Sequence, residues 1–137
     1  MVFKYKRMPS VDANYPFHLQ ALINIRLYNG TTNSVPLVAQ LDTGAAMTIV
    51  NAQVADQLYV DWKTGKRTNV YGINSDRTPV YLHDLEIEIC EIPGSKVKTQ
   101  IGFADLKNVG VLLGQHGFFE HFKVSFDAKN ETFEIGI

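Results

Sequence analysis

Leu41-Asp42-Thr43-Gly44-Ala45 places one acidic residue on a tight turn directly after an apolar run. Residues 35–41 are mostly apolar and predict a strand whose end delivers Asp42. Gly44 has no side chain, so the backbone can approach the carboxylate closely at this turn. A second apolar run that ends in glycine, Val111-Leu112-Leu113-Gly114, follows later in the chain. An Asp-Thr-Gly triplet alone is a weak signal, whereas the two segments in this order are much more specific.

Size and composition indicate one soluble globular domain. The chain has 137 residues, of which 45% are hydrophobic and 20% charged, and this balance argues against disorder. The net charge of -1 gives no indication of a nucleic-acid or anionic-membrane partner. The basic start, residues 4–7, is expected to be a solvated tail.

Cysteine content and hydropathy bear on the compartment. Cys90 is the only cysteine, so no disulfide can form within the chain, which is compatible with a reducing compartment. No stretch is apolar for long enough to span a bilayer, and the start lacks the apolar centre of a signal peptide. We therefore expect a cytoplasmic protein without a membrane segment.

Most of the chain shows the patterning of short strands. Alternating apolar residues predict a half-buried strand over 17–27, and Asn29-Gly30 predicts a hairpin turn after it. Asn51 can cap a short helix over 52–58. Further strands are expected at the ranges 48–50, 85–89 and 97–103, and a closing hairpin is expected from 123–127 and 132–137.

The aromatic residues near the end of the chain suggest one more helix. Phe118, Phe119 and Phe122 have helical spacing, which predicts a short helix packed on the core. The sum is a mostly β, single-domain protein, with a closed or folded β-barrel and one or two short helices.

Residues 67–85 predict a hairpin with a polar tip. The tip, residues 71–76, contains Gly72 between two extended arms, as suits a flap that bends over a bound ligand. An ordinary surface hairpin is the alternative interpretation.

Taken together, these segments resemble the retropepsin-like aspartic proteases, in particular bacterial and retrotransposon-like members. The resemblance covers residues 17–137 and leaves residues 1–16 as an N-terminal extension. Such an enzyme needs two carboxylates that share one proton, and this chain has one Asp-Thr-Gly. The resemblance therefore implies a homodimer in which Asp42 of each subunit meets across a two-fold axis.

The resemblance also implies roles for individual residues. Asp42 would be catalytic, Thr43 and Gly44 would position it, and the substrate would be a peptide or protein. No metal or cofactor is needed for this chemistry. The expected substrate-binding residues are Ala45, Ala46, Met47, Tyr71, Gly72, Ile73, Asn74, Val111, Leu112 and Leu113.

The sequence departs from the retroviral pattern near the site. Gln115 stands where Arg is common, and Ala46 and Met47 stand where an acid would pair with that Arg. These neutral residues favour apolar side chains in the substrate. Ala45 cannot hydrogen-bond the carboxylate as a serine could, which favours the protonated form. We therefore expect activity at mildly acidic to near-neutral pH.

Other readings of the chain remain open. A catalytically weak or inactive dimeric peptide-binding module of the same fold is the main alternative, because a fold does not guarantee activity. A protease that acts only on its own precursor is a third. His18, His83, His116 and His121 are scattered and do not predict a metal site.

Overall fold

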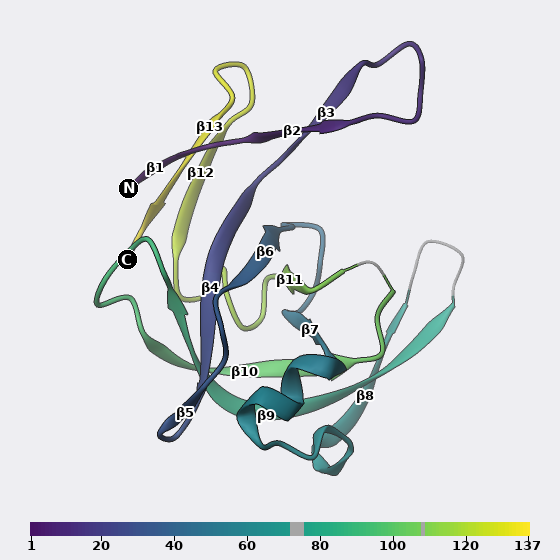
Figure 1. The fold of residues 1–137 in the computed structure, drawn as a ribbon, viewed down its shortest axis with the longest axis vertical. Coiled ribbons are helices and arrows are strands. Elements are labelled where there is room, and N and C mark those ends of the chain that lie inside the picture. Colours follow the sequence, from purple (N-terminus) through teal and green to yellow (C-terminus); the bar gives the residue numbers. More distant parts are fainter. Residues whose placement is uncertain (72–75, 108) are drawn as a thin grey trace.

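The computed structural model describes residues 1–71, 76–107 and 109–137, and its chain is folded mostly into β-strands (Figure 1). Two short 3-10 helices, η1 and η2, are the helical elements of the described residues. In chain order the elements are β1 (Val2–Lys4), β2 (Lys6–Pro9), β3 (Phe17–Gln20), β4 (Leu22–Asn29), β5 (Thr32–Asn33), β6 (Leu37–Leu41), β7 (Ile49–Asn51), η1 (Ala52–Leu58), η2 (Trp62–Thr64), β8 (Lys66–Tyr71), β9 (Arg77–Ile89), β10 (Val97–Ala104), β11 (Val111–Leu113), β12 (Lys123–Asp127) and β13 (Thr132–Gly136).

Six of these strands close into a barrel, which confirms the predicted fold class. They follow one another in the order β4, β6, β11, β7, β10 and β9, and the pairing of β4 with β9 closes the ring. The long strand β9 makes closure possible because it pairs with β8, β10 and β4 along its length. A barrel of this kind buries one face of every strand, which requires the two-residue alternation seen in the sequence.

The alternation predicted over 17–27 is confirmed from Ala21 onward. Ile23, Ile25 and Leu27 are buried in the core, at 2%, 0% and 0% exposure. The strand is interrupted at Ala21, so that β3 leaves the barrel and pairs with β2 instead. Phe17, at the start of β3, is consequently exposed rather than buried.

The turn and the first helix also follow the sequence prediction. Gly30 has a φ of 62° at the β4–β5 turn, a conformation that glycine adopts without strain. Asn51 caps η1, because its side-chain oxygen accepts a hydrogen bond from the Gln53 amide at 3.1 Å. The predicted helix over 52–58 is therefore confirmed, as a 3-10 helix.

Residues 4–7 were predicted to be a solvated tail; their basic side chains are exposed, but the backbone is not a tail, because Lys4 ends β1 in a three-stranded sheet and Lys6 and Arg7 lie in β2, which pairs with β3. The sheet has the order β1, β13, β12. The Phe3 and Phe133 rings stack with their centroids 5.2 Å apart, and the Met1 amino group donates a hydrogen bond to the Ile135 carbonyl oxygen at 2.9 Å. The start of the chain pairs with its end, although the division at residue 17 stays a prediction.

The short helix predicted around Phe118 was also wrong, because residues 117–121 form successive turns. Gly117 has a φ of 97°, outside the helical range, and interrupts any helix there. The aromatic spacing still has its expected effect on packing, since Phe118 and Phe122 are 0% and 2% exposed. None of the helices in the described ranges is long and apolar enough to cross a bilayer.

Candidate active site

Asp42 lies directly after β6, at the edge of the barrel. Its backbone amide donates a hydrogen bond to the Leu113 carbonyl oxygen at 2.9 Å, which ties the end of β6 to β11. The Gly44 amide donates to the Asp42 Oδ1 atom at 2.9 Å, and the Ala45 amide donates to the Asp42 carbonyl oxygen at 3.1 Å. The carboxylate is thus half-buried and held by the backbone of its own turn.

Gly114 lets the second apolar segment pack against this turn. A Cβ atom at position 114 would overlap the Met47 carbonyl group and lie 2.8 Å from the Ala45 carbonyl oxygen. The Gly114 amide donates to the hydroxyl oxygen of the buried Thr48 at 3.1 Å. The glycine that ends the second motif is therefore required by the close approach of two backbones.

The residues after Gly114 continue the contact. The Gln115 amide donates to the Ala45 carbonyl oxygen at 2.9 Å, and the His116 amide donates to the Ala46 carbonyl oxygen at 3.0 Å. The Gln115 side-chain amide donates to the Thr43 carbonyl oxygen at 2.7 Å. A neutral hydrogen bond from Gln115 thus holds this turn at the position where retroviral sequences commonly carry Arg.

A cavity of about 450 Å³ opens in front of Asp42. Seven of its ten lining residues were predicted from the sequence: Asp42, Gly44, Ala45, Ala46, Met47, Tyr71 and Leu112. Asp42 is the only acid among the described residues that line the cavity, whereas most of the others are apolar. The cavity can therefore receive apolar side chains beside one carboxylate.

The remaining predicted residues are placed differently. Thr43 is exposed and lines a neighbouring cavity of about 280 Å³ with Asp42. Val111 and Leu113 are both buried in the core, at 2% and 0% exposure, because they lie on the face of β11 opposite to Leu112. Val111 also contributes to the lining of a third cavity. Gly72, Ile73 and Asn74 lie outside the described residues.

Ile49, Asn69 and Val70 also line the cavity and were missed by the sequence analysis. Ile49 pairs with Leu112 across β7 and β11, and Val70 lies on β8 beside the end of the predicted hairpin. The available signal was the hairpin itself, since Asn69 and Val70 directly precede Tyr71, which was predicted to line the site. β8 and β9 pair in register up to Tyr71 and Arg77, which confirms the hairpin.

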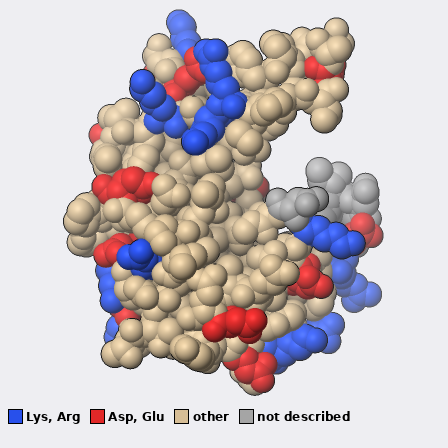
Figure 2. Space-filling model, viewed as in Figure 1, with Lys and Arg blue, Asp and Glu red and all other residues tan. Residues whose placement is uncertain are grey.

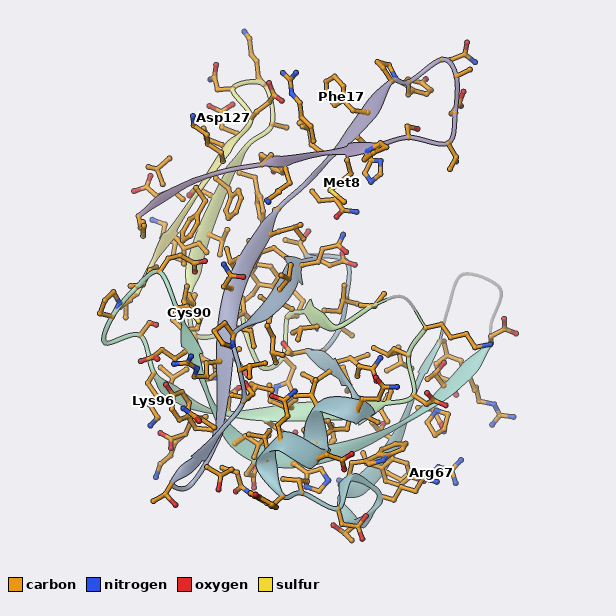
Figure 3. All side chains as sticks on the ribbon, viewed as in Figure 1. Met8, Phe17, Arg67, Cys90, Lys96 and Asp127 are labelled. Carbon is orange, nitrogen blue, oxygen red and sulfur yellow. The ribbon has the colours of Figure 1, made fainter. Side chains whose placement is uncertain are left out.

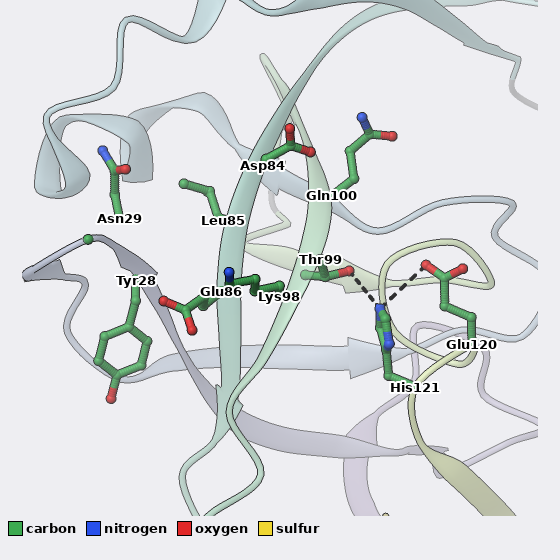
Figure 4. Close-up of a pocket in the computed structure, with 11 residues that line it drawn as sticks. Tyr28, Asn29, Asp84, Leu85, Glu86, Lys98, Thr99, Gln100, Glu120 and His121 are labelled. Atoms are coloured by element: carbon green, nitrogen blue, oxygen red, sulfur yellow. Dashed lines mark hydrogen bonds and ion pairs between the residues drawn. The ribbon is translucent and has the colours of Figure 1, made fainter.

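A larger cavity, of about 650 Å³, lies elsewhere and contains none of the Asp42 turn (Figure 4). Its Glu120 Oε1 atom accepts a hydrogen bond from the Gly117 amide at 2.8 Å and lies 3.6 Å from the His121 Nε2 atom. The Gly117 amide, and then the nearby His116 and His121, hold the pKa of Glu120 below its usual value. These contacts stabilise the 114–122 loop, and this structural role explains the cluster without assigning it to catalysis.

Metal binding has no evident place in the described part of the chain, where no group of three or more His, Cys, Asp or Glu side chains is arranged to hold an ion. The chemistry available at Asp42 is that of a carboxylate, which can accept a proton from water or donate one when protonated.

Comparison with known proteins places this geometry in context. A sequence profile described as gag-polyprotein putative aspartyl protease matches residues 28–120, more than half of the chain. Comparison with curated protein sequences gave no significant match.

Solved structures of similar fold include the EIAV protease complexed with an inhibitor. It has 21% sequence identity and a TM-score of 0.52, and the match covers 73% of this chain and 86% of that chain. A retropepsin-like aspartic protease from Rickettsia conorii has 18% identity and a TM-score of 0.61, with 99% and 97% covered. These likenesses confirm the predicted retropepsin-like fold.

Proposed function

The chain belongs to the gag-polyprotein putative aspartyl protease family, and from this premise we propose that it is an aspartic endopeptidase that is active as a homodimer. The observation that supports the proposal is that Asp42 is the one carboxylate among the described residues of the cavity. It lies on a turn that is hydrogen-bonded to Leu113 and Gln115 of the second motif region. One carboxylate is half of the required pair, so the second is that of Asp42 in another copy of the chain.

The proposed mechanism uses two carboxylates with different protonation states. Like charges at close range cannot both ionise easily, so the pair shares one proton. The ionised carboxylate takes a proton from water as the water attacks the peptide carbonyl carbon. The protonated one donates to the carbonyl oxygen, and no covalent enzyme intermediate forms.

The residues next to Asp42 would keep the pair aligned. The Gly44 amide is 2.9 Å from the Asp42 Oδ1 atom, which fixes the direction of the carboxylate. The Thr43 backbone is held by Gln115, and its exposed side chain is free to reach the turn of the partner subunit, as the family resemblance implies. We assign both residues positioning roles.

The proposed substrate is an extended peptide with apolar side chains near the scissile bond. Met47, Ile49, Val70 and Leu112 give the cavity an apolar lining. The β8–β9 hairpin would cover the peptide and exclude water, which strengthens the electrostatic interactions at the reacting bond.

Cleavage of a denatured protein mixture tests the proposal. Wild type and Asp42→Asn are compared between about pH 4 and pH 7, near the range expected for paired carboxylates. Cleavage by wild type alone, blocked by a statine-type transition-state mimic, is the expected result. Activity should also rise faster than linearly with protein concentration, because each active site needs two chains.

The alternative, a peptide-binding module without hydrolysis, makes a different prediction. Wild type and Asp42→Asn would then bind peptides equally and neither would cleave them, at concentrations where sedimentation shows a dimer.

A further inference from the structure

A third cavity, of about 520 Å³, lies between the barrel and the projecting β2–β3 hairpin. Figure 2 shows the surface of the molecule hollowed below this projecting hairpin. The cavity lining includes Met8 and Gln20 from the hairpin, together with Leu22, Val38, Gln40 and Val109 from the barrel side. Most of these side chains are apolar, and the two glutamine amides can both donate and accept hydrogen bonds.

This hollow lies next to the Asp42 site along strand β6. Val38 and Gln40 lie on one face of β6, and Asp42 follows at the same two-residue spacing. The small cavity of about 280 Å³ shares Gln20 and Gln40 with the hairpin cavity, and it shares Asp42 with the cavity in front of the carboxylate. A peptide bound at Asp42 in an extended conformation can therefore reach the hairpin.

One face of the hairpin is turned toward the hollow and the other away from it. The Met8 and His18 positions pair across the hairpin, and the Gln20 Nε2 atom lies 3.2 Å from the His18 Nε2 atom. Figure 3 shows Met8 on the side of the barrel and Phe17 on the opposite side. On that opposite face, the Arg7 guanidinium lies 4.5 Å from the centre of the Phe17 ring.

The outer face fixes the hairpin in place. Arg7 makes two hydrogen bonds to the Glu131 carboxylate, each at 2.8 Å, and Glu131 lies in the turn between β12 and β13. A bidentate pair of this kind has a defined geometry. The inner face, with Met8 and Gln20, is turned toward the hollow.

We propose that the β2–β3 hairpin forms an outer subsite, in which Met8, Leu22 and Val38 bind an apolar side chain of the substrate away from the scissile bond. The Gln20 and Gln40 amides would bond the extended peptide backbone there. The inference rests on the proposed peptidase function and deepens it. Met8, Gln20 and Leu22 precede the family match at residues 28–120, whereas Val38 and Gln40 lie within it.

Synthetic peptides of different length test the subsite. A cleavage site mapped in the denatured protein mixture is synthesised in a short form, around the scissile bond, and in long forms that carry leucine or serine at each outer position. Met8→Ala should lower kcat/KM for the best long leucine peptide about tenfold, as loss of apolar contact in a pocket does. It should leave the short peptide unchanged, and the leucine preference should disappear.

Phe17→Ala is the matched control, because it truncates an apolar side chain on the opposite face of the same hairpin. It should cleave all peptides as wild type does. Equal loss on long and short peptides with Met8→Ala, or a changed dependence on protein concentration, would overturn the subsite and make the hairpin a dimer contact. Unchanged kinetics on every peptide would overturn it as well.

A binding measurement separates this inference from the proposed function. No cleavage of the denatured protein mixture by wild type would overturn the peptidase and would leave no mapped site. A short and a long set of labelled apolar peptides, the long set with leucine or serine at each outer position, then replaces the mapped sequence. Their binding to the Asp42→Asn protein, measured by fluorescence anisotropy, decides the subsite, since Met8→Ala should weaken the binding of the long leucine peptides alone.

Discussion

At the scale of single residues, the site depends on the close approach of two backbone segments at Gly114, which has no side chain to separate them. Asp42 and Gly114 are far apart in the sequence. The Asp42 amide nevertheless donates a hydrogen bond to the Leu113 carbonyl oxygen, and the Gly114 amide donates one to the Thr48 hydroxyl oxygen. The sequence revealed both motifs because glycine and an acid in these contexts are recognisable. It could not reveal that Gln115 replaces an ion pair with a bond to the Thr43 carbonyl oxygen, since a side-chain amide has many possible partners.

Gly114→Ala should destabilise the protein by about 2 kcal/mol, because the added Cβ meets backbone atoms that cannot move independently. Urea denaturation monitored by fluorescence measures the free energy of unfolding. Gly136→Ala is the matched control, since a Cβ there meets nothing within 4 Å. Equal effects of the two substitutions would contradict the close approach.

Ala45→Ser should shift the acid limb of the kcat/KM profile downward by about half to one pH unit. A hydroxyl at this position can donate to the ionised carboxylate and so favours that form. The measurement is the pH dependence of peptide cleavage, with Ala46→Ser as the control at the neighbouring position. A profile that does not move would show that position 45 does not reach the carboxylate.

At the scale of elements, alternation and capping were predictable and loop shape was not. The period of two along β4 and the Asn51 cap of η1 are local signals, and both are confirmed. The aromatic residues near Phe118 are spaced as in a helix, yet residues 117–121 form turns. Gly117 adopts a positive φ, and its amide donates a hydrogen bond to the Glu120 carboxylate. The length of β9 follows from barrel closure, which no local pattern encodes.

Glu120→Gln should make the stability of the protein less dependent on pH. The pKa of Glu120 is lowered in the folded state, first by the Gly117 amide and then by His116 and His121. Its charge therefore stabilises the fold above the usual glutamate pKa, and this contribution is lost as pH falls through the lowered value.

Thermal unfolding followed across acidic pH measures this effect. The Tm of wild type should exceed that of Glu120→Gln near pH 6, and the difference should shrink toward about pH 3. The corresponding difference in the free energy of unfolding stays small, at most about 1 kcal/mol, since the Glu120 side chain is 43% exposed. Glu134→Gln, an exposed position on β13, should behave as wild type. A difference that grows toward low pH would contradict the assignment.

At the scale of the whole molecule, the two ends of the chain stabilise one sheet. Deletion of residues 1–5 removes β1 together with the contacts of Phe3 and Tyr5 with Phe133. Loss of aromatic packing of this kind costs about 3 kcal/mol, so a clear fall in Tm is expected. Val11→Ser, at the exposed tip of the β2–β3 hairpin, is the control. An unchanged Tm would support a separable N-terminal extension.

Asp42, the one carboxylate among the described residues of the cavity, has a further consequence for how this protein can change over generations. In the proposed homodimer, each chain builds half of the site, so one gene encodes both halves. Any codon change near Asp42 alters both walls of the cleft together, so a better fit on one side of the cleaved bond imposes the same change on the other. Specificity would then evolve in paired steps, and only a duplicated and fused gene would free the two halves to diverge.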